Sequence, residues 1–326
     1  MTKITRHLIL LTSLYLLISA VSCDKKDFDP VYRERMREFV ADISDYAKVI
    51  HPGFLVIPQN GIELVSDNGD EDGDPVQEYL SAIDANGQED LFYGYKRDDK
   101  ATPADERDYL ISFLNMSKNN GNTILVTDYC SSHDNMDDSY TKNAGRGFIS
   151  FAANHRELDN IPSYPAKPYQ ENAENINSIS QVKNFLYLLN PENYHSKNAL
   201  IEALTSTSYD LLIIDLFYSE NEALTADDLI ALKQKANGGS RLAVAYMSIG
   251  EAEEYRYYWQ RAWLSDKPSW LDKENPDWEG NYKVKYWDPA WQEIIFGTED
   301  SYLKKILDAG FDGVYLDIIE AYEYYE

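Results

Sequence analysis

The chain has 326 residues, 44% of them hydrophobic, and a formal net charge of −26 at pH 7. This composition argues against nucleic-acid binding, because phosphate recognition needs a basic surface. It suits either a cationic ligand or simply a solvated surface. With two cysteines, Cys23 and Cys130, and five scattered histidines, the chain offers neither a disulfide framework nor a recognisable metal site, and we expect no cofactor.

The first residues predict export. Two basic residues precede an apolar run from Leu8 to Val21, which is typical of a secretory signal. Small residues stand directly before Cys23, as in a bacterial lipobox. We therefore expect residues 1–22 to be a signal peptide, Cys23 to carry a lipid, and residues 23–30 to form a tether. The apolar run is shorter than the roughly 20 residues of a transmembrane helix, so lipid alone would anchor the protein to the cell envelope, with the outer membrane and cell surface as candidate locations.

Short apolar runs alternate with stretches of helical periodicity along the rest of the chain, which is typical of repeated βα units. In chain order the predicted elements are helix 33–50, strand 54–58, helix 76–85, strand 90–93, helix 103–117, strands 123–127 and 147–151, helices 181–189 and 197–204, strand 211–214, helix 225–236, strands 242–246 and 282–286, helix 289–309 and strand 313–316. Thr225 with Asp228 has the spacing of a helix capping box, and Thr102-Pro103 with Glu106 is a second helix-start signal.

Eight strands with intervening helices predict an α/β fold, a (β/α)8 TIM barrel formed by residues 31–326 as one domain. The alternative is an open doubly wound sheet, but no glycine-rich phosphate loop follows any predicted strand. Residues 154–180 lack periodicity and predict a long connection between two half-barrels. The acidic loop 67–74 is either an exposed tip or a weak calcium loop.

Polar residues follow several predicted strands, where a barrel places its active site. They are Asn60, Tyr95, Asp128, Asp215, Glu251 and Asp317. A single Asp there is often a helix cap, but four carboxylates at one face favour acid–base chemistry. Two carboxylates that flank a glycosidic bond can hydrolyse it. Tyrosine-rich clusters such as Tyr255–Trp259 suit the faces of sugar rings, whereas no G-x-S-x-G motif supports a serine hydrolase and Cys130 has no evident partner.

Four runs of the sequence resemble glycoside hydrolase family 114, which includes endo-α-1,4-polygalactosaminidases. They are Tyr209–Asp215, Ala245–Trp259, Tyr286–Trp291 and Ala309–Asp317. In that family, segments similar to Gly53–Gly61, Glu89–Gly94 and Thr127–Tyr129 follow the segment that ends in Asp317, whereas here they precede it. The resemblance therefore implies a circular permutation, although a truncated duplication or a mis-joined gene model would give the same order.

In the permuted barrel, residues 31–153 supply family strands 5–8, residues 154–180 connect the halves, and residues 181–326 supply family strands 1–4. The first and last units of a barrel are neighbours, so we predict that Tyr32 and Glu326 lie near each other.

For the active members, the resemblance implies a retaining reaction with Asp317 as nucleophile and Glu89 as general acid/base, about 5 to 5.5 Å apart. Asp90 is the alternative to Glu89 for the general acid/base role, because the sequence around these two residues departs from the family pattern. The residues expected to bind substrate are Asp215, Glu251, Asp128, Asn60, Tyr246, Tyr93 and Tyr315. The implied partner is a polysaccharide, and an acidic cleft would suit the ammonium groups of a galactosamine polymer.

Two other functions stay open. A sugar-binding lipoprotein would keep the barrel and its cleft without turnover, and a structural envelope protein would leave the strand-end carboxylates unexplained. The positions of two carboxyls distinguish the sugar-binding lipoprotein from the enzyme, because turnover requires Asp317 and Glu89 to face each other across the barrel mouth.

Overall fold

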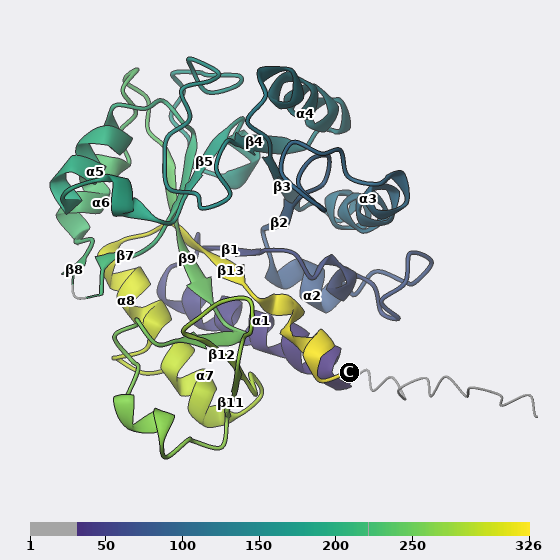
Figure 1. The fold of residues 1–326 in the computed structure, drawn as a ribbon, viewed down its shortest axis with the longest axis vertical. Coiled ribbons are helices and arrows are strands. Elements are labelled where there is room, and N and C mark those ends of the chain that lie inside the picture. Colours follow the sequence, from purple (N-terminus) through teal and green to yellow (C-terminus); the bar gives the residue numbers. More distant parts are fainter. Residues whose placement is uncertain (1–30, 221) are drawn as a thin grey trace, which may run out of the picture.

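The computed structural model describes residues 31–220 and 222–326, so the predicted signal peptide, Cys23 and tether lie outside the described residues. Figure 1 shows helices arranged around a central set of strands. The helices are α1 (Val31–Ile50), α2 (Gln77–Ala82), α3 (Ala104–Asn119), α4 (His133–Arg146), α5 (Lys197–Thr205), α6 (Ala226–Leu232), α7 (Pro289–Ile295) and α8 (Tyr302–Ala309). Within the described ranges, no helix combines the length and apolar character that crossing a membrane requires.

The central strands form two parallel sheets within the described residues. A five-stranded sheet has the order β1-β13-β9-β6-β5, and a three-stranded sheet has the order β2-β3-β4. These strands are β1 (Leu55–Pro58), β2 (Ala85–Glu89), β3 (Thr123–Tyr129), β4 (Ile149–Ala153), β5 (Phe185–Leu188), β6 (Leu211–Ile214), β9 (Leu242–Ser248) and β13 (Gly313–Asp317). All their pairings are parallel, so their carboxyl ends lie on one side of the molecule.

The two sheets meet at both of their outer strands. Gln59, just after β1, forms a parallel bridge with Gly87 of β2, and the next amide, of Asn60, donates to the Gly87 carbonyl at 2.9 Å. At the other side β4 lies beside β5, and the rings of Phe151 and Phe185 are 5.8 Å apart. The fold is therefore mixed α/β with a parallel central sheet, compatible with the predicted barrel.

The central strands are apolar because both of their faces are covered, as expected for parallel sheets. All four residues of β6 are buried, and so are all seven of β9. Within the five-stranded sheet, the rings of Tyr187 in β5 and Tyr315 in β13 contact edge to face at 5.2 Å. A Cβ atom on Gly87 would lie 1.9 Å from the Tyr315 hydroxyl oxygen, so this close approach requires glycine.

Strand 90–93 and helix 181–189 are wrong predictions. The strand in that unit is β2, whose sequence Ala-Asn-Gly-Gln-Glu has little apolar signal, while Leu91 and Phe92 pack into the core from the turn that follows. The apolar run from Phe185 forms strand β5 rather than a helix. Short continuous apolar runs do not distinguish buried strands from buried helices. Helix α4 was not predicted, because His133–Arg146 is mostly polar.

The predicted strand 282–286 is also misplaced. Residues Asn281–Val284 form β12, which pairs antiparallel with β10 (Glu251–Glu253) and β11 (Leu271–Glu274) in a small sheet outside the central strands. A second accessory pair is the hairpin of β7 (Phe217–Ser219) and β8 (Glu222–Ala223). The predicted helix 289–309 is divided into α7 and α8, because α7 ends at Ile295 and Gly297 adopts a positive φ of 91°. The 154–180 segment is irregular, as predicted, up to a short 3₁₀ helix, Ile179–Gln181, that begins at its end.

The capping box at Thr225 is confirmed. The Asp228 amide donates to Thr225 Oγ1 at 3.3 Å, and the Thr225 amide donates to Asp228 Oδ2 at 2.8 Å. The start signal at Thr102-Pro103 is confirmed, because α3 begins at Ala104 with Pro103 as its N-cap. The Thr102 hydroxyl does not cap the helix and instead donates to the Asp90 carbonyl at 2.6 Å. The proline side chain offers no acceptor for the first amides of α3.

We expect Thr225→Ala to lower the free energy of unfolding by about 0.5–2 kcal/mol, because the first turn of α6 loses its side-chain acceptor. Urea unfolding followed by circular dichroism measures this change. Thr141→Ala in α4 is the matched control: Thr141 is exposed and donates only to the carbonyl one turn earlier. An equal loss in both variants would contradict the capping role.

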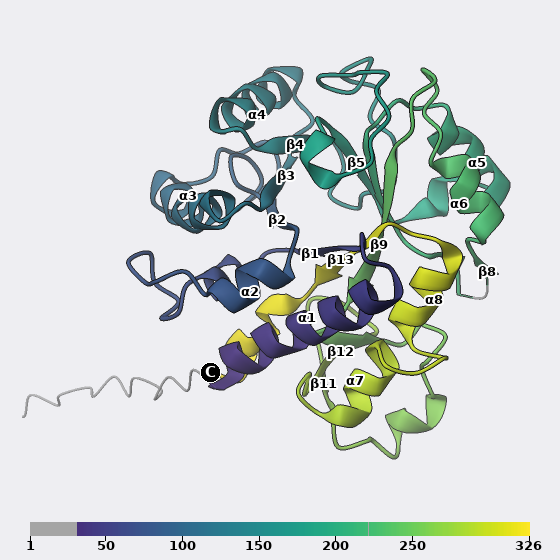
Figure 2. The same ribbon diagram turned by 180° about the vertical axis from the view of Figure 1, so that it is seen from behind.

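The two ends of the described chain lie together, as predicted. The rings of Tyr32 and Tyr325 are 5.6 Å apart, and the Arg33 guanidinium lies 3.3 Å from the Glu326 carboxylate. Figures 1 and 2 both show the C-terminus against the start of α1. The hydroxyl of Tyr286 also donates to the Tyr32 carbonyl at 2.6 Å. This end of α1 is thus packed against the last residues of the chain.

Candidate active site

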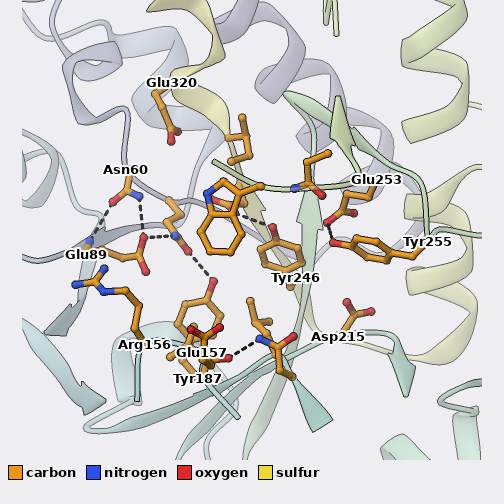
Figure 3. Close-up of a pocket in the computed structure, with 18 of the residues that line it drawn as sticks. Asn60, Glu89, Arg156, Glu157, Tyr187, Asp215, Tyr246, Glu253, Tyr255 and Glu320 are labelled. Atoms are coloured by element: carbon orange, nitrogen blue, oxygen red, sulfur yellow. Dashed lines mark hydrogen bonds between the residues drawn. The ribbon is translucent and has the colours of Figure 1, made fainter. Parts of the chain in front are cut away.

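A cavity of about 370 Å³ opens at the carboxyl ends of the parallel strands. Figure 3 shows Glu89 and Asn60 on one side of this catalytic cavity and Asp215 and Tyr255 on the other. Its lining also includes the last residue of β13, Asp317, and Trp278 at the rim, whose side chain is 60% exposed. The cavity therefore combines carboxylates with aromatic rings.

Asp317 ends β13 and receives a hydrogen bond from the Tyr246 hydroxyl at 2.7 Å. Desolvation, followed by repulsion from Glu89, raises the pKa of Asp317 to about 7, although the Tyr246 bond opposes this shift. Asp317 is thus protonated in the empty cavity at acidic pH. It must lose that proton before it can act as a nucleophile.

Glu89 ends β2 and is held by three donors. Gln59 Nε2 and Asn60 Nδ2 donate to Glu89 Oε2 at 2.7 and 3.0 Å, and the Tyr129 hydroxyl donates to Oε1. Strand β1 lies between β2 and β13, so Glu89 and Asp317 stand two strand positions apart. Both carboxyls line the same cavity, and the charge of Glu89 acts on Asp317.

The backbone is strained immediately after Asp317. Ile318 lines the cavity and adopts a φ of 59°, which is a rare conformation for a β-branched residue. Such a conformation costs about 1–3 kcal/mol and persists where the surroundings impose it. The strained turn leads directly into a 3₁₀ helix, Ile319–Tyr324. This helix brings Glu320 to the cavity, as Figure 3 shows.

Glu320 adds a third carboxyl group. Its Oε2 atom is buried and has no hydrogen-bond partner among the described residues. Burial, followed by repulsion from Asp317, raises the pKa of Glu320 well above its usual value. Burial and repulsion thus both favour the protonated form of Glu320, whose carboxyl shares the cavity with Asp317 and Glu89.

Arg256 organises the opposite wall. Its guanidinium contacts Asp215 Oδ2 at 2.7 Å and Glu253 Oε2 at 2.6 Å. The backbone amide of Phe217 also donates to Asp215, at 2.7 Å. Burial raises the pKa of Asp215, and Arg256 opposes the shift. Because this network is internally paired, Asp215 supplies a rigid polar wall rather than a free acid or base.

Arg156 belongs to the long connection and reaches the other wall. It contacts Asp90 at 3.0 Å and Asp98 at 2.8 Å, and its guanidinium lies 3.9 Å from the centre of the Tyr129 ring. Asp90 is turned toward this cation and does not line the cavity. The geometry thus favours Glu89 over Asp90 as the carboxyl that faces a bound ligand.

Four residues predicted to bind substrate do not line the catalytic cavity. Asp128 is fully buried and accepts bonds from backbone amides after β2 and from two side chains of α4. The Tyr93 hydroxyl donates to Asp138 at 2.6 Å, and Tyr315 is buried among the central strands. Glu251 lies in β10, where Asn275 donates to it at 2.9 Å. Asp215, Asn60 and Tyr246 do line the cavity, whereas Tyr95 does not.

Sequence reasoning missed part of the lining. The residues of the lining that were not predicted include Gln59, Tyr129, Arg156, Tyr187, Glu253, Trp278 and Glu320. Gln59 and Tyr129 stand next to the predicted residues Asn60 and Asp128. Because successive side chains of a strand point to opposite faces, this alternation was the signal that could have identified them. Arg156 and Trp278 lie in irregular segments and gave no pattern. Within the described residues, no group of three His, Cys, Asp or Glu side chains could hold a metal ion, the acidic loop 67–74 included.

Three curated proteins share part of this sequence. Uncharacterized protein MJ1477 of Methanocaldococcus jannaschii is 42% identical over 182 residues, which cover 55% of this chain and 49% of that protein. An uncharacterized protein of Thermotoga maritima is 39% identical over 133 residues, 40% of this chain and 39% of that protein. One of Deinococcus radiodurans is 40% identical over 123 residues, 38% and 37% respectively. The chain thus spans about half the length, or less, of these relatives.

A family comparison covers the second half of the chain. Residues 165–325 match the model of glycoside-hydrolase family GH114. This region contains strands β5, β6, β9 and β13, and with them Asp215, Tyr246 and Asp317 of the cavity. Residues 165–325 are therefore similar to glycoside-hydrolase family GH114, as the sequence motifs indicated.

Proposed function

We propose that the protein is a retaining, endo-acting glycoside hydrolase, with Asp317 as nucleophile and Glu89 as general acid/base. The observation that carries this proposal is that both carboxyls line one cavity at the strand ends, close enough for the charge of Glu89 to raise the pKa of Asp317. Paired carboxyls flanking a glycosidic bond supply everything that hydrolysis requires.

In the proposed reaction, Glu89 gives its proton to the glycosidic oxygen while Asp317 attacks the anomeric carbon, so that the glycosidic bond breaks and a glycosyl ester forms. Glu89, now ionised, takes a proton from a water molecule whose oxygen attacks the anomeric carbon, so that the bond from this carbon to the Asp317 carboxyl oxygen breaks and the carboxylate is released. The Tyr246 hydroxyl bonded to Asp317 stabilises the carboxylate that must attack. Asn60 and Tyr129 hold the Glu89 carboxyl in place.

The proposed substrate is an α-1,4-linked galactosamine-type polysaccharide. The cavity lining contains six carboxylates and two arginines, and both arginines are already paired with carboxylates. This excess of negative charge favours a ligand that carries ammonium groups. Trp278 at the rim and the tyrosines of the wall offer flat surfaces for sugar rings.

The proposal includes a closed, circularly permuted (β/α)8 barrel on an exported, lipid-anchored protein. Three features support the permuted barrel. The family match begins at residue 165, the two parallel sheets adjoin at β1–β2 and at β4–β5, and the Tyr32 and Tyr325 rings are in contact. The signal-like run before Cys23 supports export.

The direct test is incubation of the purified protein with partly deacetylated α-1,4-galactosaminan, followed by mass spectrometry of released oligomers and by nuclear magnetic resonance of the first anomer formed. We expect oligomers of several lengths with retained configuration. Release of single sugars alone would contradict endo action, and inverted products would contradict the nucleophile role of Asp317.

Activity should depend on pH through Asp317. The reaction needs one proton on the pair of carboxyls, on Glu89, with Asp317 ionised. Because the pKa of Asp317 beside Glu89 is raised to about 7, the pair loses this last proton above that value, so kcat/KM should decline about tenfold per pH unit on the alkaline side. A pH profile of kcat/KM measures this. An activity that stays constant from about pH 7 to about pH 9 would contradict the raised pKa of Asp317.

One observation favours a second function, a sugar-binding lipoprotein without turnover. Glu89 accepts three hydrogen bonds, so a glycosidic oxygen would have to compete with Gln59, Asn60 and Tyr129 for its carboxyl. Calorimetric binding of galactosamine oligomers with no product after long incubation would support this alternative.

A further inference from the structure

A second hollow continues from the catalytic cavity. This groove has a volume of about 140 Å³ and is lined in part by Leu189, Asn190, Asp215, Tyr255 and Arg256. The same five residues also line the catalytic cavity. The two hollows therefore share a wall and form one continuous depression at the strand ends.

The groove extends away from Glu89. In the order of neighbouring strands, β2 stands two positions from β13 on one side, across β1, and β6 stands two positions from β13 on the other, across β9. Glu89 ends β2, whereas Asp215 follows β6. A polymer chain bound at Asp317 can thus extend past Asp215, on the side opposite the general acid, as the arrangement in Figure 3 indicates.

Aromatic rings line the far part of the groove. Phe217 and Tyr257 stack at 5.6 Å with an interplanar angle of 28°, and Tyr218 lies beside them in β7. The Tyr218 hydroxyl donates to the Tyr194 carbonyl at 2.6 Å, which fixes the ring before any ligand arrives. A fixed aromatic ring binds at low entropic cost, and its flat face suits a sugar.

The shared wall is rigid and polar. Arg256 holds Asp215 at 2.7 Å, and Asp215 in turn accepts the amide of Phe217 at 2.7 Å. The same ion pair therefore fixes the boundary of the catalytic cavity and the first residue of the aromatic strand β7. Neither partner is needed for the bond-breaking step, so this pair is available to position a neighbouring sugar unit.

We propose that the groove between β7 and the Arg256 wall is a further subsite, which binds a sugar unit of the polysaccharide beyond those at Asp317 and Glu89. This inference rests on the proposed glycosidase function and extends it to substrate length. The protein then recognises a polymer segment longer than the two units whose bond is cleaved, and short oligomers leave the subsite empty.

The test measures binding as a function of oligomer length. Calorimetry with the Asp317→Asn variant and galactosamine oligomers of increasing length should show affinity that rises with length and then levels off. Tyr218→Ala in the same background should weaken binding of the long oligomers about tenfold and leave the shortest unchanged. Tyr46→Ala is the matched control, because Tyr46 is a half-buried ring on α1 outside both hollows.

An equal loss at all lengths, or no loss for Tyr218→Ala, would overturn the subsite while leaving the glycosidase proposal intact. If no oligomer is bound or cut, the proposed function fails together with the subsite. Should Tyr218→Ala not fold, the parent protein provides a second measurement: kcat/KM must rise with oligomer length beyond the shortest oligomer that is cleaved, and a constant value rejects the subsite.

Discussion

Asp317→Asn is expected to lower kcat/KM on the polysaccharide by more than about a thousandfold. An amide cannot attack the anomeric carbon to form the glycosyl ester, and loss of a covalent nucleophile removes much of the rate enhancement. The amide keeps the size of the side chain and can still accept the hydrogen bond from Tyr246. Initial rates of oligomer release, measured beside the parent, test the prediction.

The same variant should be more stable than the parent at alkaline pH. The folded-state pKa of Asp317 is about 7 and its ordinary value is 3.8, so the folded protein binds this proton more tightly than the unfolded chain does. Ionised Asp317 therefore destabilises the fold, by an amount that grows as the pH rises from about 4 to about 7. The asparagine side chain does not ionise, so the variant does not undergo this destabilisation.

Thermal melting at pH 4 and pH 8 distinguishes this pH-dependent gain in stability from a change in stability that is the same at every pH. We expect a similar Tm for parent and variant at pH 4 and a higher Tm for the variant at pH 8. Asp308→Asn is the control: Asp308 lies on α8 and its side chain is 62% exposed. A variant that is both inactive and less stable at pH 8 would indicate that Asp317 supports the fold rather than the reaction.

Glu89→Gln should lower kcat/KM on the polysaccharide by about a hundredfold to ten-thousandfold, the usual contribution of a general acid. The loss should be much smaller on a glycoside with a good leaving group, such as a nitrophenyl aglycone, because that oxygen leaves without being protonated. Comparing the two substrates therefore identifies the acid. A similar loss on both would contradict the assignment.

Two further variants sharpen this comparison. Asp90→Asn tests the rival carboxyl, which is paired with Arg156 and does not line the cavity. Its effect should be small and independent of the leaving group. Glu38→Gln on the exposed side of α1 controls for the loss of one negative charge. A strong dependence on the leaving group in Asp90→Asn would transfer the acid role to Asp90.

Strand ends were a partial guide to the site. The sequence places Asp128 and Tyr129 next to each other at the end of β3, but successive side chains of a strand point to opposite faces. Asp128 points to α4, where Ser139 donates to it at 2.6 Å, and Tyr129 points into the cavity and contacts Glu89. The rule that polar strand ends form the site does not decide which of two neighbours faces inward.

The sequence alone indicated the family resemblance, the elements with strong apolar patterns and the carboxyls Asp317 and Glu89 as candidates, because these depend on local composition and on the order of motifs. Only the tertiary structure decided that Asp215 is neutralised by Arg256, that Glu251 lies in an accessory sheet, and that Arg156 and Glu320 reach the cavity. These facts depend on which distant segments meet. Pairing, burial and charge repulsion arise between residues far apart in the chain, so no local pattern records them.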